Sequence, residues 1–233
     1  MAEYEKIKGL TIQALDEDPG APSGGTWASG GALNTGRQKL STTGTQSATL
    51  AFGGEPTPGK VKAETYNGTA WTEVADLNTG RMITSSFGTQ SAAIGAGGGA
   101  PVKDETEEWN GASWSEVGDI NTARQAAAGS IKGTTSSGII FGGYVSDYSA
   151  LVEQWNGTGW TEIGDLNTAR DLPGGAGTTT AALVYGGTSP GGTREIVTES
   201  WNGTSWTEVN DLNSARTGIS TGGGPATSAI AAG

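Results

Sequence analysis

Carboxylates recur at regular positions along the chain, and their type and spacing make them the first candidates for chemistry. One set of glutamates contains Glu64, Glu107, Glu153 and Glu199. Two more sets follow it at constant spacing: Glu73, Glu116, Glu162 and Glu208, and then Asp76, Asp119, Asp165 and Asp211. A pair of carboxylates can hydrolyse a glycosidic bond without histidine, provided that one stays protonated and the other ionised.

The repetition of these acids argues against catalysis. Copies of one unit have nearly the same environment, whereas a catalytic pair needs two different environments. A set of arginines recurs with the glutamates: Arg37, Arg81, Arg124, Arg170 and Arg216. We therefore interpret the first glutamate set and the arginines as charge partners that tie repeated units together. A ring of ligand-binding arginines is the alternative.

Other common chemistries lack their residues. The chain has no cysteine and no histidine, which removes thiolate chemistry, the commonest general base and the commonest zinc ligand. The acids at residues 16–18 lack the spacing of a calcium-binding loop. No glycine-rich phosphate loop opens a helix. The sequence therefore predicts no cofactor and no metal site.

The charge balance limits the partners. With 24 acidic and 13 basic residues, the formal net charge is −11. An acidic chain is poorly suited to the phosphate backbone of nucleic acid or to an anionic membrane. The sequence has no apolar run long enough for a membrane span and no signal peptide pattern. We expect no nucleic-acid partner and no membrane insertion.

The stretch from Glu107 to Arg124, EEWNGASWSEVGDINTAR, has three close copies in the chain and a fifth partial one ending at Arg37. The arginines lie 44, 43, 46 and 46 residues apart. Tryptophans follow the same intervals: Trp27, Trp71, Trp114, Trp160 and Trp206. Periods of about 40 to 50 residues are typical of propellers and solenoids. The repeat units are 37–80, 81–123, 124–169, 170–215, and a split unit of 216–233 plus 26–36.

Each unit has room for four short strands and shows no helical periodicity. The runs TLAFGG, AAIGAGG, GIIFGG and ALVYGG predict a central strand buried on both faces. Asn-Gly between two extended segments is typical of a type I′ hairpin turn, in which both turn residues have positive φ. A two-residue loop pairs Glu107 with Trp114, and a four-residue loop pairs Trp109 with Trp114. Both registers place the two rings on one side.

Four strands per unit, a double glycine after the second strand, an aromatic residue ending the third and a tryptophan opening the fourth resemble kelch repeats. The phrases LNTAR, GTQSA and FGG resemble, more narrowly, the kelch-like repeats of structural proteins from bacteriophages, particularly marine ones. The resemblance covers about residues 26–233. It departs from the family in its five units, which are shorter than the kelch period of about 50 residues. Tyr66 keeps the usual third-strand tyrosine, which Trp109, Trp155 and Trp201 replace.

The two ends of the chain carry complementary parts of one unit. Residues 216–233 match the first two strands, and residues 26–33 match a fourth strand after a 25-residue lead. Joining terminal strands in one sheet removes exposed edges. The sequence thus predicts an all-β, five-bladed kelch-like propeller whose fifth blade is closed by the N- and C-terminal strands. The third strand of that blade is missing: KIKGLTIQAL in the lead could fill it or insert into a larger assembly, or the chain stops short of its natural end.

Differences among the copies concentrate in one kind of loop. The segments EPTPGKVK, GAPVKDE, YVSDYSA and TSPGGTRE, between the second and third strands, vary in length and charge and share one predicted rim. Loops carry recognition while the scaffold carries stability. The candidate ligand-binding residues are Lys60, Lys103, Asp104, Tyr144, Asp147, Tyr148 and Arg194. Ordinary surface variation is the alternative explanation for this set.

Tyr144 and Tyr148 are the most informative of these residues, since an exposed aromatic pair can stack on the apolar face of a sugar. A neutral or weakly basic host-surface glycan suits the acidic chain best. The resemblance implies a non-enzymatic structural component of a virion, assembled in the host cytoplasm and displayed on the particle as a decoration or tail fibre protein. Residues 1–25 would attach it to other virion proteins. A free lectin-like propeller and, further away, a propeller glycosidase are the alternatives.

Overall fold

The computed structural model describes residues 30–56, 60–99, 101–130, 132–227 and 229–232. The chain divides into two compact units, Met1–Gly30 and Gly31–Gly233. The predicted lead at 1–25, and Trp27 with the start of the predicted fourth strand, lie outside the described residues. The described part of the chain contains no helix, and so none long and apolar enough to cross a membrane.

Sixteen strands form four four-stranded antiparallel sheets. The first sheet contains β1 (Ser41–Thr45), β2 (Ala48–Phe52), β3 (Ala63–Tyr66) and β4 (Trp71–Glu73). The second contains β5 (Ser85–Gly88), β6 (Ala93–Gly98), β7 (Lys103–Trp109) and β8 (Trp114–Val117). The third contains β9 (Ala128–Gly129), β10 (Gly138–Phe141), β11 (Val152–Trp155) and β12 (Trp160–Glu162). The fourth contains β13 (Gly174–Gly177), β14 (Ala182–Tyr185), β17 (Thr198–Trp201) and β18 (Trp206–Val209).

Two smaller antiparallel sheets complete the described strands. Strands β15 (Thr188–Ser189) and β16 (Thr193–Arg194) form a short hairpin in the loop between β14 and β17. Strands β19 (Ser220–Gly223) and β20 (Ile230–Ala232) pair with each other and are called the fifth sheet below. The prediction of an all-β chain with repeated four-stranded units is confirmed, and the fold is consistent with a β-propeller.

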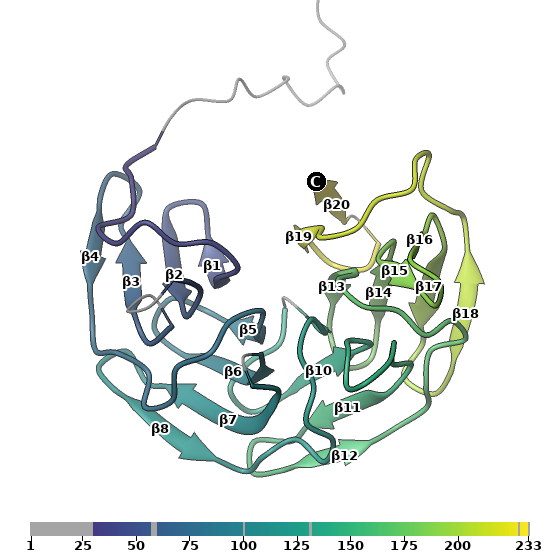
Figure 1. The fold of residues 1–233 in the computed structure, drawn as a ribbon, viewed down its shortest axis with the longest axis horizontal. Helices are drawn as coiled ribbons and strands as arrows, with labels where there is room; N and C mark the ends of the chain where they lie inside the picture. Colours follow the sequence, from purple (N-terminus) through teal and green to yellow (C-terminus); the bar gives the residue numbers. More distant parts are fainter. Residues whose placement is uncertain (1–29, 57–59, 100, 131, 228, 233) are drawn as a thin grey trace, which may run out of the picture. The chain divides into compact units, whose positions relative to one another are not determined.

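Successive sheets lie next to one another in chain order. The first strands of neighbouring sheets are in contact: β1 with β5, β5 with β9, β9 with β13, and β13 with β19. These strands lie innermost, whereas β4, β8, β12 and β18 lie outermost (Figure 1). The second strand of each large sheet is mostly buried, as the glycine-bounded apolar runs predict.

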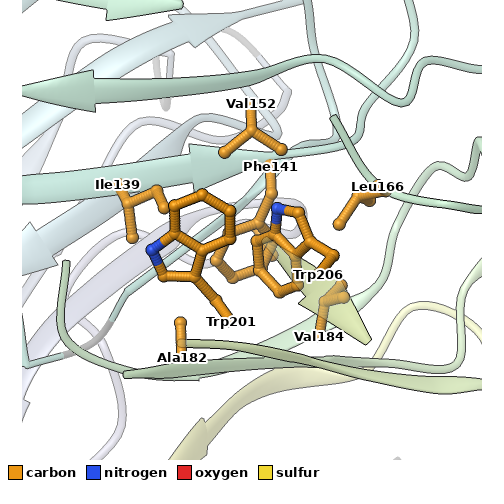
Figure 2. Close-up of a cluster of buried hydrophobic side chains, with 9 residues drawn as sticks. Ile139, Phe141, Val152, Leu166, Ala182, Val184, Trp201 and Trp206 are labelled. Atoms are coloured by element: carbon orange, nitrogen blue, oxygen red, sulfur yellow. The ribbon is translucent and has the colours of Figure 1, made fainter. Parts of the chain in front are cut away.

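The hydrophobic core consists of separate clusters, one between each sheet and the next. Between the third and fourth sheets, Ile139, Phe141 and Val152 pack against Trp201 and Trp206 (Figure 2). The rings of Phe141 and Trp206 meet edge to face, with their centroids 5.6 Å apart. Burying such aromatic side chains is the dominant stabilising term, so packing against neighbouring sheets holds the described sheets together.

The hairpin between the third and fourth strands has the four-residue loop. Trp109 is directly opposite Trp114, and the ring centroids are 5.4 Å apart. The expected type I′ turn is wrong: only Gly111 of the Asn-Gly pair has positive φ. Instead, the side chain of Asn110 accepts hydrogen bonds from the backbone N–H groups of Ala112 and Ser113, both at 2.9 Å. The asparagine is repeated because its side chain closes the loop.

The double glycines mark close approaches of the backbone. Gly53 and Gly54 have φ of 67° and 106°, which favours glycine. A Cβ on Gly53 would lie 2.6 Å from the carbonyl oxygen of Arg81. The N–H of Gly54 donates to that same oxygen at 2.9 Å. The glycines therefore let the end of the second strand touch the segment that leads to the next sheet.

Candidate functional site

Arg81 and Glu107 form a buried ion pair, with Arg81 Nη2 2.7 Å from Glu107 Oε1. Both side chains are fully inaccessible to solvent. Glu107 also accepts hydrogen bonds from the backbone N–H groups of Asn78 (2.8 Å) and Thr79 (3.1 Å). The side-chain amide of Asn78 donates to Glu107 Oε2 at 3.0 Å. We call this arrangement of an arginine, a glutamate and an asparagine the clasp.

The clasp occurs four times. Each copy joins an arginine of the repeat series to the glutamate of a third strand: Arg37 to Glu64, Arg81 to Glu107, Arg124 to Glu153 at 2.8 Å and Arg170 to Glu199 at 2.6 Å. The asparagines are Asn34, Asn78, Asn121 and Asn167. The structure thus brings together the four glutamates and four of the five arginines that the sequence singles out.

Three of the clasps, those of Arg81, Arg124 and Arg170, connect two described sheets. The backbone N–H of Arg81 donates to the carbonyl oxygen of Lys60 in the first sheet at 2.9 Å, while the side chain reaches Glu107 in β7 of the second. The backbone of Arg216 repeats the first half of this arrangement, with its N–H 3.2 Å from the carbonyl oxygen of Glu195. Breaking a buried pair leaves an uncompensated charge, which typically costs about 3 to 5 kcal/mol.

The environment of the clasp shifts the pKa of its members. Burial raises the pKa of Glu64, but hydrogen bonds from Asn34, Arg37 and Thr35 outweigh it, and the pKa lies below the ordinary value. Burial lowers the pKa of Arg124 and of Arg170. The attraction of Glu153 and of Glu199 raises the pKa of each arginine and offsets part of this effect. A carboxylate that is buried, ionised and occupied by four donors has no free lone pair or access for a substrate.

Four of the candidate ligand-binding residues lie in or next to the second-to-third connections. Lys60 is half-buried, and Arg194 is exposed in β16. Lys103 and Asp104, expected in a loop, instead begin strand β7. The Nζ of Lys103 lies 3.4 Å from Glu105 Oε1, and Asp104 is exposed.

The tyrosine pair is arranged differently from the expectation. Tyr144 and Tyr148 are half-buried rather than exposed, and their rings meet edge to face with centroids 5.7 Å apart. Tyr144 also forms an isolated β-bridge with Gln125. The carboxylate of Asp147 accepts a hydrogen bond from the N–H of Tyr148 at 2.8 Å. The two rings therefore contact each other and do not form an open stacking platform.

A cavity of about 440 Å³ lies between the first strands. It is lined by residues of β1, β5 and β9 and those just before them, by Leu172 and Pro173 before β13, and by Gly218 and Ile219 before β19. Four of the lining residues have a left-handed backbone although none is glycine: Lys39 (φ 56°), Ile83 (φ 52°), Ala126 (φ 59°) and Leu172 (φ 47°). Gly218, with φ of 65°, occupies the fifth equivalent position. Each lies two residues after an arginine of the repeat series.

Backbone hydrogen bonds join these five positions in series. The N–H of Ile83 donates to the carbonyl of Lys39 (2.9 Å), that of Ala126 to Ile83 (3.0 Å), that of Leu172 to Ala126 (2.8 Å), and that of Gly218 to Leu172 (3.1 Å). The left-handed conformation therefore serves a sheet-to-sheet connection around the cavity.

Comparison with known proteins gives no identification. No family model matches the chain. No curated protein matches it significantly either. The functional argument therefore depends on the clasp, the rim of variable connections and the cavity.

Sequence reasoning missed two sets of residues. The asparagines of the clasp carried a signal, because Asn occurs at the same place in every copy of the motif. The left-handed positions carried almost none, since the five residues there differ in type and only Gly218 suggests positive φ. Within the described residues, no three acids gather in a group that could hold a metal ion.

Proposed function

We propose that the chain is a closed five-bladed β-propeller that a tailed phage displays on its particle as a non-enzymatic binding module. One observation carries the proposal. The glutamates and arginines of the clasps are buried between the repeats, whereas the differences among repeats gather on one rim and around the cavity. A protein with an invariant frame and one variable face is suited to recognition.

Residues 31–37 support the closure. The indole N–H of Trp71 donates to the carbonyl of Gly31 at 3.0 Å, and that of Trp206 donates to the carbonyl of Gly164 at the same distance. Gly164 follows the fourth strand of the sheet before that of Trp206. By this equivalence, Gly31 follows the fourth strand of a sheet before the first one, which is the fifth sheet in a closed propeller.

The exposure of the first sheet also supports the closure. The tryptophans that open β8, β12 and β18 are buried beneath the preceding sheet: Trp114, Trp160 and Trp206. Trp71 and its neighbour Tyr66 are only half-buried. In a closed propeller the fifth sheet would cover them, with the tryptophan burial that three of the described interfaces have.

The clasp supports a non-enzymatic role. The glutamates of the first set are buried, and the oxygens of Glu107 are occupied by arginine, asparagine and backbone donors, as in the other clasps. A general acid or nucleophile needs access to substrate and a lone pair or proton to exchange. The remaining repeat acids face solvent at equivalent positions.

The place on a virion comes from the resemblance of the repeats to those of phage structural proteins. In this proposal residues 1–25 attach the propeller to other virion proteins, and the variable rim meets a neutral or weakly basic glycan of the host surface. The net charge of −11 disfavours an anionic glycan, because like charges repel across an interface.

The experiment is a deletion of residues 1–25 in the phage. We expect the shortened chain to fold with an unchanged melting temperature and to be absent from purified particles. Loss of folding would show instead that the lead completes the fifth sheet. Incorporation into particles at the normal level would contradict attachment through this segment.

A free lectin is the second candidate, favoured by the variable rim. If the protein is a free lectin, it should bind selected glycans on a glycan array, and the intact chain should be absent from phage particles. A glycosidase predicts that one acid is essential for turnover. Equal properties of the single replacements Glu107→Gln, Glu153→Gln and Glu199→Gln would exclude these acids as catalytic residues.

A further inference from the structure

The cavity between the first strands has the size and construction of a ligand site. Its volume of about 440 Å³ falls within the range of roughly 300 to 1,000 Å³ that small-molecule sites occupy. All five repeats contribute to its lining, so there is one such cavity per chain. Backbone bridges connect the residues beside it to the variable connections, as between Gln125 and Tyr144 and between Gln38 and Glu55.

The left-handed residues beside the cavity indicate a functional constraint. Left-handed backbone is costly for residues other than glycine, and for a β-branched residue such as Ile83 it is an outlier. Gly218 shows that glycine is accepted at this position of the repeat. The other four repeats nevertheless keep a side chain here, and each keeps a different one. The backbone of these positions joins neighbouring sheets whatever the side chain, so the differing side chains indicate a role in recognition.

The cavity has a polar wall and an apolar wall. The polar wall consists of hydroxyl side chains from β1 and β5 and the residue before β5: Ser41, Thr42, Thr84, Ser85 and Ser86. The apolar wall comes from the later repeats, chiefly Ala126, Ala128, Leu172, Pro173 and Ile219. The lining contains no acid, and its one cation, Lys39, forms an ion pair with Glu55 at 2.7 Å.

The three serine protons of the polar wall are already used, whereas Thr84 Oγ1 is buried without a hydrogen-bond partner. Ser41 Oγ donates to the carbonyl of Thr84 (2.6 Å), Ser85 Oγ to that of Ala127 (3.0 Å), and Ser86 Oγ to that of Thr42 (3.2 Å). The serine oxygens keep lone pairs, so this wall can accept hydrogen bonds but has few donors to offer. A carboxylate or phosphate would face these lone pairs, whereas a sugar hydroxyl can donate to them.

We propose that this cavity binds one uncharged sugar residue per chain, with hydroxyl groups directed to the serines of β1 and β5 and an apolar face against Leu172 and Ile219. The inference rests on the glycan contact of the proposed function and makes it specific. The protein would then have one central sugar site instead of one shallow site per repeat. The half-buried Tyr144 and Tyr148 would lie near this site without forming it.

The first test measures binding to the full chain in solution by saturation-transfer NMR. The probes are the methyl glycosides of glucose, galactose, mannose, N-acetylglucosamine, fucose and rhamnose, with glucuronic acid as the anionic control. We expect at least one neutral glycoside to bind with a stoichiometry of one and glucuronic acid not to bind. Absence of binding by all six, or preference for glucuronic acid, would overturn the proposal.

Two substitutions locate the binding. Gly218→Leu adds a side chain at the vacant fifth position, where a Cβ has no atom within 4 Å. Gly191→Leu is the matched control, with φ of 86° and equally open space, but in the turn between β15 and β16. We expect Gly218→Leu to weaken binding of the selected glycoside at least tenfold and Gly191→Leu to leave it unchanged. Equal affinities of the two variants would refute the central site.

Leu172→Gly tests whether sugar affinity can fall without a loss of thermal stability. Glycine suits the left-handed backbone, so the melting temperature should stay the same or rise, while loss of an apolar contact should weaken binding several-fold. Unchanged affinity would contradict the assigned wall. These measurements use the isolated chain, so the cavity proposal can fail while the protein still joins particles, and a chain that binds sugar but never joins particles refutes only the virion role.

Discussion

The clasp shows what one buried charge contributes at the scale of a residue. Glu107→Gln keeps the shape of the side chain but leaves the buried guanidinium of Arg81 without its counter-charge. We expect the free energy of unfolding to fall by about 3 to 5 kcal/mol, as for other broken buried pairs. Urea denaturation followed by tryptophan fluorescence measures this change. Glu116→Gln, at an exposed repeat position, is the control and should change stability little.

Replacing Asp171 should stabilise the protein, in contrast to replacing Glu107. Burial raises the pKa of its carboxyl group above the ordinary value of 3.8, and Oδ1 is buried without a hydrogen-bond partner. Because the folded pKa exceeds the unfolded one, the stabilising contribution of the protonated form is present below pH 3.8 and is lost as pH rises through the folded pKa. Asp171→Asn should therefore raise the free energy of unfolding at pH 7.

The pH dependence provides the check on Asp171→Asn. The gain in stability over the natural chain should shrink as the pH falls toward 3.8, where the natural carboxyl group is itself protonated. Asp165→Asn, at an exposed position, should show no such trend. A gain that is the same at acid and neutral pH would mean that the charge of Asp171 is not its cause.

For the clasp, the sequence predicted which charged residues take part but not all of their hydrogen-bond partners. Equal spacing predicted that the glutamates and arginines belong to one structural system, and they form the clasps. The role of Asn78 was not predicted, because a constant asparagine beside a turn is equally suited to capping the backbone. Only the structure shows that it approaches a carboxylate 29 residues away.

At the scale of the element, the hairpin between the third and fourth strands depends on an asparagine side chain. Asn110→Ala removes the acceptor for two backbone N–H groups. We expect a loss of stability of about 1 kcal/mol, as for the removal of a capping side chain. Asn110→Asp keeps the acceptor and should restore most of the stability in thermal unfolding. Equal losses in both variants would show that the side chain does not close the loop.

Sequence patterns predicted the elements better than their turns. Period, glycine boundaries and hairpin signals predicted four strands per unit, because these follow from burial and chain reversal. The register of Trp109 and Trp114 stayed open, since both loop lengths place the rings on one side. The type I′ turn was wrong because the Asn-Gly pair was interpreted through its backbone preferences alone. The left-handed residues were invisible for a related reason: tertiary contacts around the cavity impose their conformation.

At the scale of the whole molecule, the number of repeats could be counted from the sequence, whereas closure could not. Each of the four described interfaces has its own hydrophobic cluster, and three of the clusters contain a tryptophan pair. The fifth interface would join β19 and β20 to the first sheet. This interface forms only if the fifth sheet covers Trp71 and Tyr66. The spacing of the repeats alone does not specify which strands meet at this interface.

Closure is testable with paired spin labels, because the chain has no cysteine of its own. Gly36→Cys precedes Arg37 of the first sheet, and Thr227→Cys lies between β19 and β20. The equivalent pair across a described interface is Ala169→Cys, before Arg170, with Ser136→Cys, between β9 and β10. If the fifth sheet packs on the first as the third packs on the fourth, both pairs should give the same narrow distance distribution. A longer or broader distribution for Gly36 and Thr227 alone would mean that the propeller is open between its ends, and the central cavity would then lack its fifth side.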